Sequence, residues 1–229
     1  MKLALFDLDG TLLPTDSDHA FGEFMVTLGW VDGQVWRRRN DDFFAQYQAG
    51  TLNLAEYVAF ATSAWRERSL AEAEAARERF MQEVIGPALH ERARRLVDGH
   101  LEAGDLVAVV TATNEFVTRP IATAFGVAHL LAVELERDAQ GRATGAIRGV
   151  PTFREGKVTR VEAWLAAQGH RWDDFEDVLF YSDSTNDLPL LEKVRSPVAT
   201  NPTPALASID RKSTRLNSSH RCISYAVFC

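Results

Sequence analysis

The chain has 229 residues, of which 46% are hydrophobic and 25% are charged, and its net charge is −7. This balance is typical of a soluble globular protein with one large domain or two small ones, and it argues against extensive disorder. The acidic excess argues against nucleic-acid binding, which depends on basic surfaces, and no apolar run reaches the about 18 residues of a membrane helix.

The sequence also favours a cytoplasmic location. Its N-terminus lacks the basic region and apolar core of a secretory signal. Both cysteines, Cys222 and Cys229, lie in the last few residues, so the body of the chain has no pair to form a disulfide. We expect a cytoplasmic protein without a membrane partner, and we make no prediction of its oligomeric state.

The first predicted element is a buried strand over residues 3–9, which ends on Asp7 and Asp9 and runs directly into Gly10. A long helical block follows. Two apolar stripes with the i, i+3, i+4, i+7 spacing of one helix face indicate helices there: Phe21, Phe24, Met25 and Leu28, then Leu54, Tyr57, Val58, Ala61 and Trp65. Asn53 and Ser69 are predicted N-caps, because each has a glutamate three residues later.

Strand and helix patterns alternate in the rest of the chain. A further helical stripe runs from Leu89 to His100 and stops at Gly104. The predicted strands after it are 106–114, 129–136, 177–183 and 197–200, with a hairpin arm at 142–149, and the predicted helices are 116–125, 157–167 and 188–194.

The last twenty residues change character. From Asp210 the chain reads "DRKSTRLNSSHRCISYAVFC", which has no amphipathic period. Its first part looks like a translated sequencing-library adapter, so we interpret residues 210–229 as a non-native tail and exclude them from functional reasoning.

These elements predict an α/β fold, a three-layer Rossmann-like arrangement in which helices flank a parallel sheet. The helical block interrupts the sheet after its first strand, which is typical of an inserted cap. We expect a catalytic core formed by residues 1–14 and 100–209, with a helical cap at 15–99.

Four polar groups follow the predicted strands or open a helix near them. They are Asp7 with Asp9; Thr111, Thr113 and Asn114; Lys157; and Asp183 with Asn186 and Asp187. Because the carboxyl ends of parallel strands meet at one edge of a sheet, the acids would repel one another there unless a positive charge sat among them. Mg²⁺ prefers carboxylate and carbonyl oxygens, and Lys157 would add a second positive charge.

Such a site matches a phosphoryl group. Asp7, at the strand end, is the candidate nucleophile that forms an aspartyl-phosphate, and Asp9, two positions on, is the candidate general acid and base. Gly10 permits a close turn. Thr111 and neighbouring backbone N–H groups such as that of Ala112 would hold phosphate oxygens.

The motifs that carry these residues are "FDLDGTL", "VVTATN", the lysine of "EGKVTRVEAW" and "YSDSTNDLPLL". Together they resemble the four successive motifs of the haloacid dehalogenase superfamily of phosphohydrolases, and the helical insertion resembles the cap of its phosphoserine-phosphatase-like branch. The resemblance implies that Asp7, the main-chain carbonyl of Asp9 and Asp183 hold Mg²⁺. It also implies that Thr111 and Lys157 bind the phosphoryl group, supported by Asn186 and Asp187.

Two departures bear on the substrate, a small phosphomonoester. Phosphoserine phosphatases typically carry a glutamate where this chain has Asp16, and a cap arginine that falls near Ala59, where no basic residue stands. Histidinol phosphate lacks the carboxylate that such an arginine binds, while Asp16 or Asp18 could meet its amine. We therefore favour histidinol phosphate over phosphoserine.

Three alternatives belong to other classes. A phospho-acceptor receiver domain also gathers Asp, Thr and Lys around Mg²⁺, but it normally places its acid pair and its acceptor on different strands. A nucleotide kinase is disfavoured because Pro151 and Val158 stand where a phosphate-binding loop needs Gly and Ser or Thr. The third alternative is a truncated phosphatase that has lost its activity with its C-terminal segment.

Overall fold

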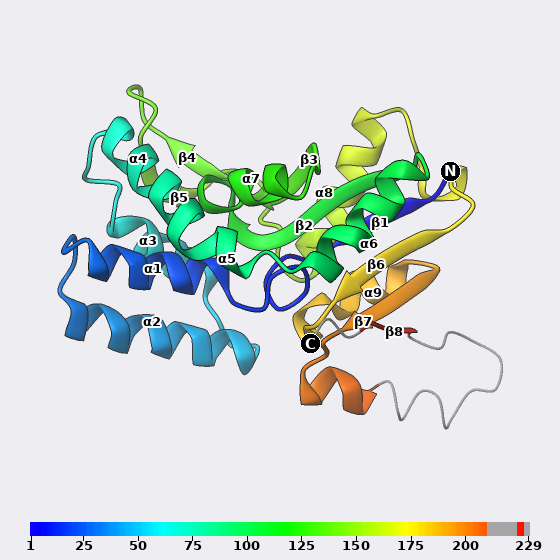
Figure 1. Ribbon diagram of the computed structural model, residues 1–229, viewed down its shortest axis with the longest axis horizontal. Helices are drawn as coiled ribbons and strands as arrows, with labels where there is room; N and C mark the ends of the chain where they lie inside the picture. Colours follow the sequence, from blue (N-terminus) through cyan, green and yellow to red (C-terminus); the bar gives the residue numbers. More distant parts are fainter. Residues whose placement is uncertain (210–223, 227–229) are drawn as a thin grey trace.

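The computed structural model describes residues 1–209 and 224–226. Its main sheet is parallel, in the order β3-β2-β1-β6-β7-β8 (Figure 1). The strands are β1 (Leu3–Phe6), β2 (Leu106–Asn114), β3 (His129–Val133), β6 (Val178–Ser182), β7 (Ser196–Thr200) and β8 (Ser224–Ala226). The chain winds outward from β1 in both directions, so the topological switch point lies beside β1, where parallel α/β sheets bind their ligands.

Helices cover both faces of this sheet. Because side chains alternate along a strand, Leu3 and Leu5 of β1 face one core and Ala4 and Phe6 face the other. The first core also contains residues of α8 (Glu155–Ala167) and α9 (Leu188–Lys193). The second contains residues of α6 (Glu91–Glu102) and α7 (Glu115–Ala124). The three-layer α/β fold predicted from the sequence is confirmed.

The inserted helices lie beyond one end of the sheet, on the left of Figure 1. They are α1 (Ser17–Thr27), α2 (Gly33–Gln48), α3 (Leu54–Ser63), α4 (Leu70–Phe80), the π-helical turn η1 (Met81–Ile85) and α5 (Gly86–Ala88). Both predicted N-caps are confirmed: the Asn53 side chain accepts from the Glu56 N–H, and Ser69 forms a reciprocal capping box with Glu72. Local sequence therefore determines where α3 and α4 begin.

The strand predicted at 129–136 is wrong as a single element. It divides into β3 of the main sheet and β4 (Leu135–Arg137), which pairs antiparallel with β5 (Ala143–Ile147) in a separate hairpin. Glu134 lies at the division, where its carboxylate pairs with Arg148 and Arg160. The chain leaves the main sheet at this residue, whose partners lie 14 and 26 positions away in the sequence. The apolar alternation along the strand carries no sign of these contacts.

The end of the first strand also differs from the sequence prediction. Strand β1 ends at Phe6 rather than continuing to residue 9, because the Leu8 carbonyl accepts from the amides of Thr11, Leu12 and Leu13 and bends the chain. The domain boundaries stay a prediction, and the one between residues 99 and 100 falls inside the single helix α6. Two short 3₁₀ helices flank β6: η2 (Trp172–Asp174) precedes it and η3 (Thr185–Asp187) follows it.

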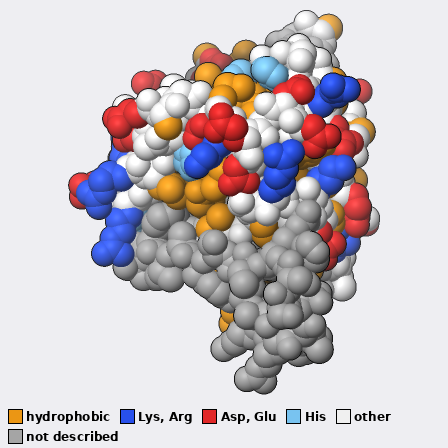
Figure 2. Space-filling model, turned by 90° about the vertical axis from the view of Figure 1, so that its right-hand side faces the viewer, with side chains coloured by type: hydrophobic (Ala, Val, Ile, Leu, Met, Phe, Trp, Pro, Cys, Tyr) orange, Lys and Arg blue, Asp and Glu red, His pale blue; other side chains and the backbone are white. Residues whose placement is uncertain are grey.

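No helix in the described ranges is long and apolar enough to cross a membrane. Figure 2 shows that acidic and basic side chains are interspersed over the visible part of one face. The triple arginine Arg37–Arg39 lies exposed on α2, with Trp36 buried beside it. The predicted non-native tail, 210–229, lies outside the described residues except for the backbone of β8.

Candidate active site

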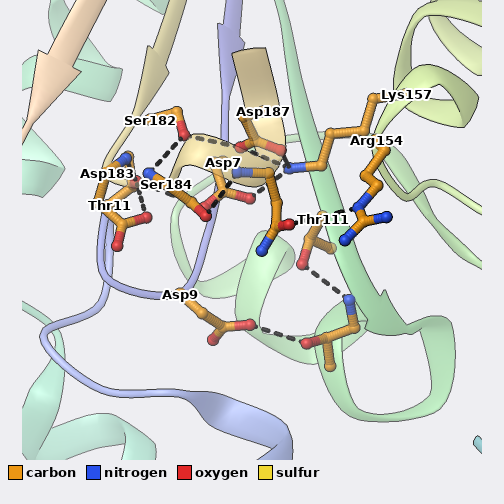
Figure 3. Close-up of polar contacts among 12 residues, drawn as sticks. Asp7, Asp9, Thr11, Thr111, Arg154, Lys157, Ser182, Asp183, Ser184 and Asp187 are labelled. Carbon is orange, nitrogen blue, oxygen red and sulfur yellow. Dashed lines mark hydrogen bonds and ion pairs between the residues drawn. The ribbon is translucent and has the colours of Figure 1, made fainter. Parts of the chain in front are cut away.

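A buried lysine joins two carboxylates at the carboxyl edge of the sheet (Figure 3). Lys157 is 1% exposed, and its Nζ lies 2.8 Å from Asp7 Oδ1 and 2.7 Å from Asp187 Oδ1. Asp187 also accepts a hydrogen bond from the Ser182 hydroxyl at 2.7 Å. Asp7 follows β1, Lys157 lies in the first turn of α8, and Asp187 follows β6, so three distant segments build this triad.

A third carboxylate, that of Asp183, lies on the other side of the Thr11 hydroxyl from Asp7. Thr11 Oγ1 is 3.4 Å from both Asp7 Oδ2 and Asp183 Oδ1, so one hydroxyl spans the two acids. Gly10 has φ +75°, and a Cβ at this position would lie 2.4 Å from Asp183 Oδ2. Only glycine permits this approach, which brings Asp183 against the backbone that follows Asp9.

This donor set fits a hard divalent cation. It offers two carboxylates and a neighbouring main-chain carbonyl, the oxygen ligands that Mg²⁺ accepts while keeping several waters. Within residues 1–209, no group of three or more His, Cys, Asp or Glu side chains is arranged to hold a metal. The ligand set implied by the sequence needs only two side chains, Asp7 and Asp183, with the Asp9 carbonyl as the third protein ligand.

The electrostatics of the site favour an added cation. Burial raises the pKa of Asp7 to about 7 despite the opposing effect of Lys157. Burial, followed by the charges of Asp7 and Asp187, raises the pKa of Asp183 to about 8. Burial by itself would lower the pKa of Lys157, but Asp187 and Asp7 outweigh it and keep the ammonium charged. The single positive charge of Lys157 therefore does not offset the negative charges of the ionised carboxylates. A bound cation would stabilise their ionised forms.

Asp9 is held separately from this cluster. Its Oδ1 accepts from the Ser17 N–H at 2.8 Å and its Oδ2 from the Thr113 hydroxyl at 2.8 Å. Burial, and then the charge of Asp16, raises the pKa of Asp9 to about 7. A carboxyl group with a pKa near neutrality is suited to exchange protons in both directions.

The residues predicted to bind phosphate lie around Asp7. Thr111 and Ala112 line the same cavity as Asp7 and Asp9. Asn186 is engaged elsewhere: its Nδ2 donates to the Tyr47 carbonyl at 3.0 Å, and its Oδ1 lies 3.4 Å from Arg154 Nε. The phosphate-binding role of these residues, with that of Lys157, stays a prediction.

Two cavities open beside the acids, and they have free spaces of about 530 and 1370 Å³ including their mouths. Asp16, His19, Phe44 and Tyr47 line both. The first is lined by Asp7, Asp9, Asp16, His19, Asn40, Phe43, Phe44, Tyr47, Leu52, Leu54, Tyr57, Thr111, Ala112 and Thr113. No lysine or arginine of the described chain lines either cavity.

The two acids considered for the substrate amine differ in position. Asp16 caps α1 through Oδ1, which accepts from the Asp18 and His19 N–H groups, and it faces the cavity. Asp18 is 6% exposed, accepts from Asn114 Nδ2 at 3.1 Å and bonds the Tyr57 hydroxyl, and it does not line either cavity. Asp16 therefore faces the cavity, whereas Asp18 is bonded within the protein, and the role of either acid in binding an amine stays a prediction.

Sequence reasoning missed several residues that organise the site. The strand pattern places Thr113 at a strand end but does not pair it with Asp9, and nothing in the pattern links Thr11 to Asp183. Arg154 donates to the Gly50 carbonyl of the helical block, and it has φ 51°, which is strained for a non-glycine residue. The "DGT" and "TAT" strings are visible signals for Thr11 and Thr113, whereas no local pattern identifies Arg154.

Comparisons with known proteins agree with this geometry. The profile of haloacid dehalogenase-like hydrolases matches residues 4–192. The chain is 40% identical to a histidinol-phosphatase of Neisseria meningitidis serogroup C (strain 8013) over 88% of this chain and 90% of that protein.

Solved structures show the same fold. A protein of unknown function from Bordetella pertussis Tohama I is 47% identical and superposes with a TM-score of 0.89 over 98% of this chain and 97% of that one. A substrate-bound phosphoserine phosphatase superposes with a TM-score of 0.66 at 19% identity, over 90% and 89% of the two chains. The second likeness concerns the fold alone.

Proposed function

The chain belongs to the haloacid dehalogenase-like hydrolase family and is a phosphatase, and we propose that it hydrolyses a small amino-alcohol phosphomonoester with Mg²⁺. The reaction would pass through an aspartyl-phosphate formed on Asp7. Histidinol phosphate is the favoured substrate and phosphoserine the second. The receiver domain and the nucleotide kinase are disfavoured, because the family match spans most of the chain.

Asp7, Asp183 and the Asp9 main-chain carbonyl would hold Mg²⁺, with Asp187 supporting the site through Lys157. When bound, the cation supplies positive charge that offsets the phosphoryl oxygens and the crowded carboxylates. Lys157 holds Asp7 Oδ1 at 2.8 Å, which leaves the second oxygen of Asp7 to attack phosphorus. Thr111 and the backbone N–H groups beside it, including that of Ala112, would bind phosphoryl oxygens as charge develops on them.

Asp9 would serve both half-reactions. In the first, Asp7 attacks phosphorus and the protonated Asp9 gives its proton to the leaving alkoxide. In the second, the ionised Asp9 takes a proton from the attacking water, and the phosphate departs from Asp7. The Ser17 N–H and the Thr113 hydroxyl fix the Asp9 carboxyl in place, so the same group is positioned for both transfers.

The charge of the cavity lining carries the substrate proposal. Asp7, Asp9 and Asp16 line the first cavity, and no lysine or arginine of the described chain lines it with them. A leaving group with a free carboxylate would meet repulsion there, whereas an ammonium group would be attracted by Asp16. The arginine nearest the predicted clamp position, Arg66, donates to the Ala59 carbonyl and lies at the β5 hairpin rather than in the cavity.

Steady-state kinetics on histidinol phosphate and phosphoserine, with and without Mg²⁺, test this proposal. We expect a higher kcat/KM for histidinol phosphate and no turnover in chelator. An Asp16→Asn variant should lose more kcat/KM on histidinol phosphate than on an aryl phosphate whose leaving group carries no amine. A higher kcat/KM on phosphoserine would contradict the substrate assignment, and phosphate release unaffected by chelator would contradict the mechanism. An inactive chain whose sheet edge is unfolded would support the truncated-phosphatase alternative.

A further inference from the structure

The first cavity has two chemically different ends. Asp7, Asp9 and the Thr111–Thr113 segment form the end at the sheet edge. The residues contributed by the helical block are mostly apolar or aromatic: Phe43, Phe44, Tyr47, Leu52, Leu54 and Tyr57. A leaving group as small and polar as serine would leave this second end without an apolar partner.

Three of the four aromatic residues are already committed to other contacts. Phe43 is 1% exposed and packs edge-on against Tyr57, with ring centroids 5.4 Å apart. The Tyr57 hydroxyl bonds Asp18, and the Tyr47 hydroxyl bonds Ser184 across to the sheet edge. These three residues form the walls of the cavity, and their rings are held by the fold.

Phe44 differs from them in its exposure: it is 36% exposed, whereas the other three are buried or half-buried, and like Tyr47 it lines both cavities. Its ring lies 5.4 Å from the imidazole of His19, and the planes are tilted by 54°. His19 also lines both cavities. Two neighbouring rings, one from α1 and one from α2, therefore belong to the lining of both cavities.

The orientation of His19 is determined by α2. Its Nε2 lies 3.0 Å from Asp41 Oδ1, and its carbonyl accepts from Asn40 Nδ2 at 3.2 Å. Gly22 lets α1 and α2 approach, since a Cβ there would lie 2.7 Å from Trp36 Nε1. The His19–Phe44 pair is thus preorganised, and it stands beside Asp16 at the entrance to the nucleophile.

Resting on the proposed function, we infer that Phe44 and His19 are specificity-determining residues that hold a planar ring on the leaving group. The preferred substrates are then phosphate monoesters of amino alcohols with an aromatic heterocyclic side chain. The ring packs against Phe44 while the amine lies toward Asp16. An electron-poor or cationic ring gains further from the face of Phe44 and from the negative cavity.

The test compares two substrates that differ in the ring. Histidinol phosphate and the phosphate of 2-aminopropan-1-ol share the phosphate and the amine, but the second has a methyl group in place of the imidazolylmethyl group. For Phe44→Leu, which keeps apolar bulk, we expect the kcat/KM ratio of the ring substrate to the ring-free one to fall about three- to tenfold, mainly through KM. Phe44→Tyr, which restores a ring, should keep the wild-type ratio.

One control variant and two further measurements separate local effects from general ones. Val35→Ala lies on the same helix, at a side chain 69% exposed and outside both cavities, and it should change neither substrate. His19→Gln should lower the ratio in the same direction as Phe44→Leu. Calorimetry of the product histidinol should show a matching loss of affinity in Phe44→Leu.

The outcomes distinguish a failure of the ring subsite from a failure of the proposed function. If the wild type prefers the ring-free substrate, or if Phe44→Leu leaves the ratio unchanged, the ring subsite is wrong although the phosphatase proposal stands. If the wild type releases phosphate from neither substrate and binds no histidinol, the proposed function and the subsite both fail.

Discussion

Replacing Lys157 with methionine tests the charge balance on which the site depends. The variant keeps most of the side-chain volume but removes the cation that contacts Asp7 and Asp187 at 2.8 and 2.7 Å. Removing one partner of a buried ion pair typically costs about 3–5 kcal/mol, because the remaining charges stay buried without compensation. We therefore expect the free energy of unfolding to fall by about 4 kcal/mol, a large share of the about 5–15 kcal/mol of a typical domain.

The loss of stability in the Lys157→Met variant should depend on pH. Burial already raises the folded-state pKa of Asp7 to about 7 and that of Asp183 to about 8, above the about 3.9 of an unfolded aspartate. A raised acid pKa favours the folded state at low pH, and this advantage is lost as pH rises through the folded pKa. Without Lys157 the two pKa values rise further, so the stability gap between the two proteins should be wider at pH 8 than at pH 5.

Urea unfolding in chelator, followed by circular dichroism at both pH values, measures this gap. With a slope of about 2 kcal/mol per molar urea, the midpoint should fall by roughly 2 M at pH 8. Lys193→Met is the matched control, since Lys193 is 44% exposed and pairs with Glu162 at 3.3 Å, and it should change stability by less than about 1 kcal/mol. A Lys157→Met variant as stable as the control at pH 8 would refute the reasoning.

Three further predictions concern catalysis and the metal. Asp7→Asn should reduce phosphate release at least about a thousandfold, since it removes the nucleophile, while circular dichroism should still show a folded protein, because Lys157 keeps its ion pair with Asp187; appreciable residual turnover would argue for another nucleophile. Thr113→Val removes a hydrogen bond that lowers the pKa of Asp9, so the pKa should rise and the alkaline limb of the kcat/KM profile should move to higher pH, with kcat lowered about tenfold; an unmoved limb would separate Thr113 from the acid. Mg²⁺ should raise the melting temperature of the wild type in a concentration-dependent way, and Asp183→Asn should abolish that rise; equal stabilisation of both proteins would place the cation elsewhere.

The order of the chemical groups along the chain is readable from the sequence alone. Each motif directly follows an apolar strand pattern or opens a helix, and parallel strands deliver their carboxyl ends to one edge. For this reason the sequence predicts that Asp7, Asp183, Asp187 and Lys157 belong together, and the fold brings them together. The caps at Asn53 and Ser69 are equally readable, because capping involves groups only three residues apart.

The helical block shows the limit of such reasoning. Asp16 and Asp18 are equivalent candidates in the sequence, two positions apart. Only the packing of α1 places Asp16 at the cavity and leaves Asp18 bonded to Asn114 and Tyr57. The contact between the rings of His19 and Phe44 likewise depends on the close approach of α1 and α2 at Gly22.

The amino-acid sequence by itself therefore determined the sheet elements, the reacting groups and their order along the chain, because periodicity and motif spacing are local properties. The tertiary structure decided which acid faces the substrate, which threonine holds Asp9, where residues 129–136 leave the sheet and which aromatic rings line the leaving-group end. Those outcomes depend on contacts between residues far apart in the chain, such as Asp9 with Thr113 and Asp18 with Asn114, and no local pattern encodes them.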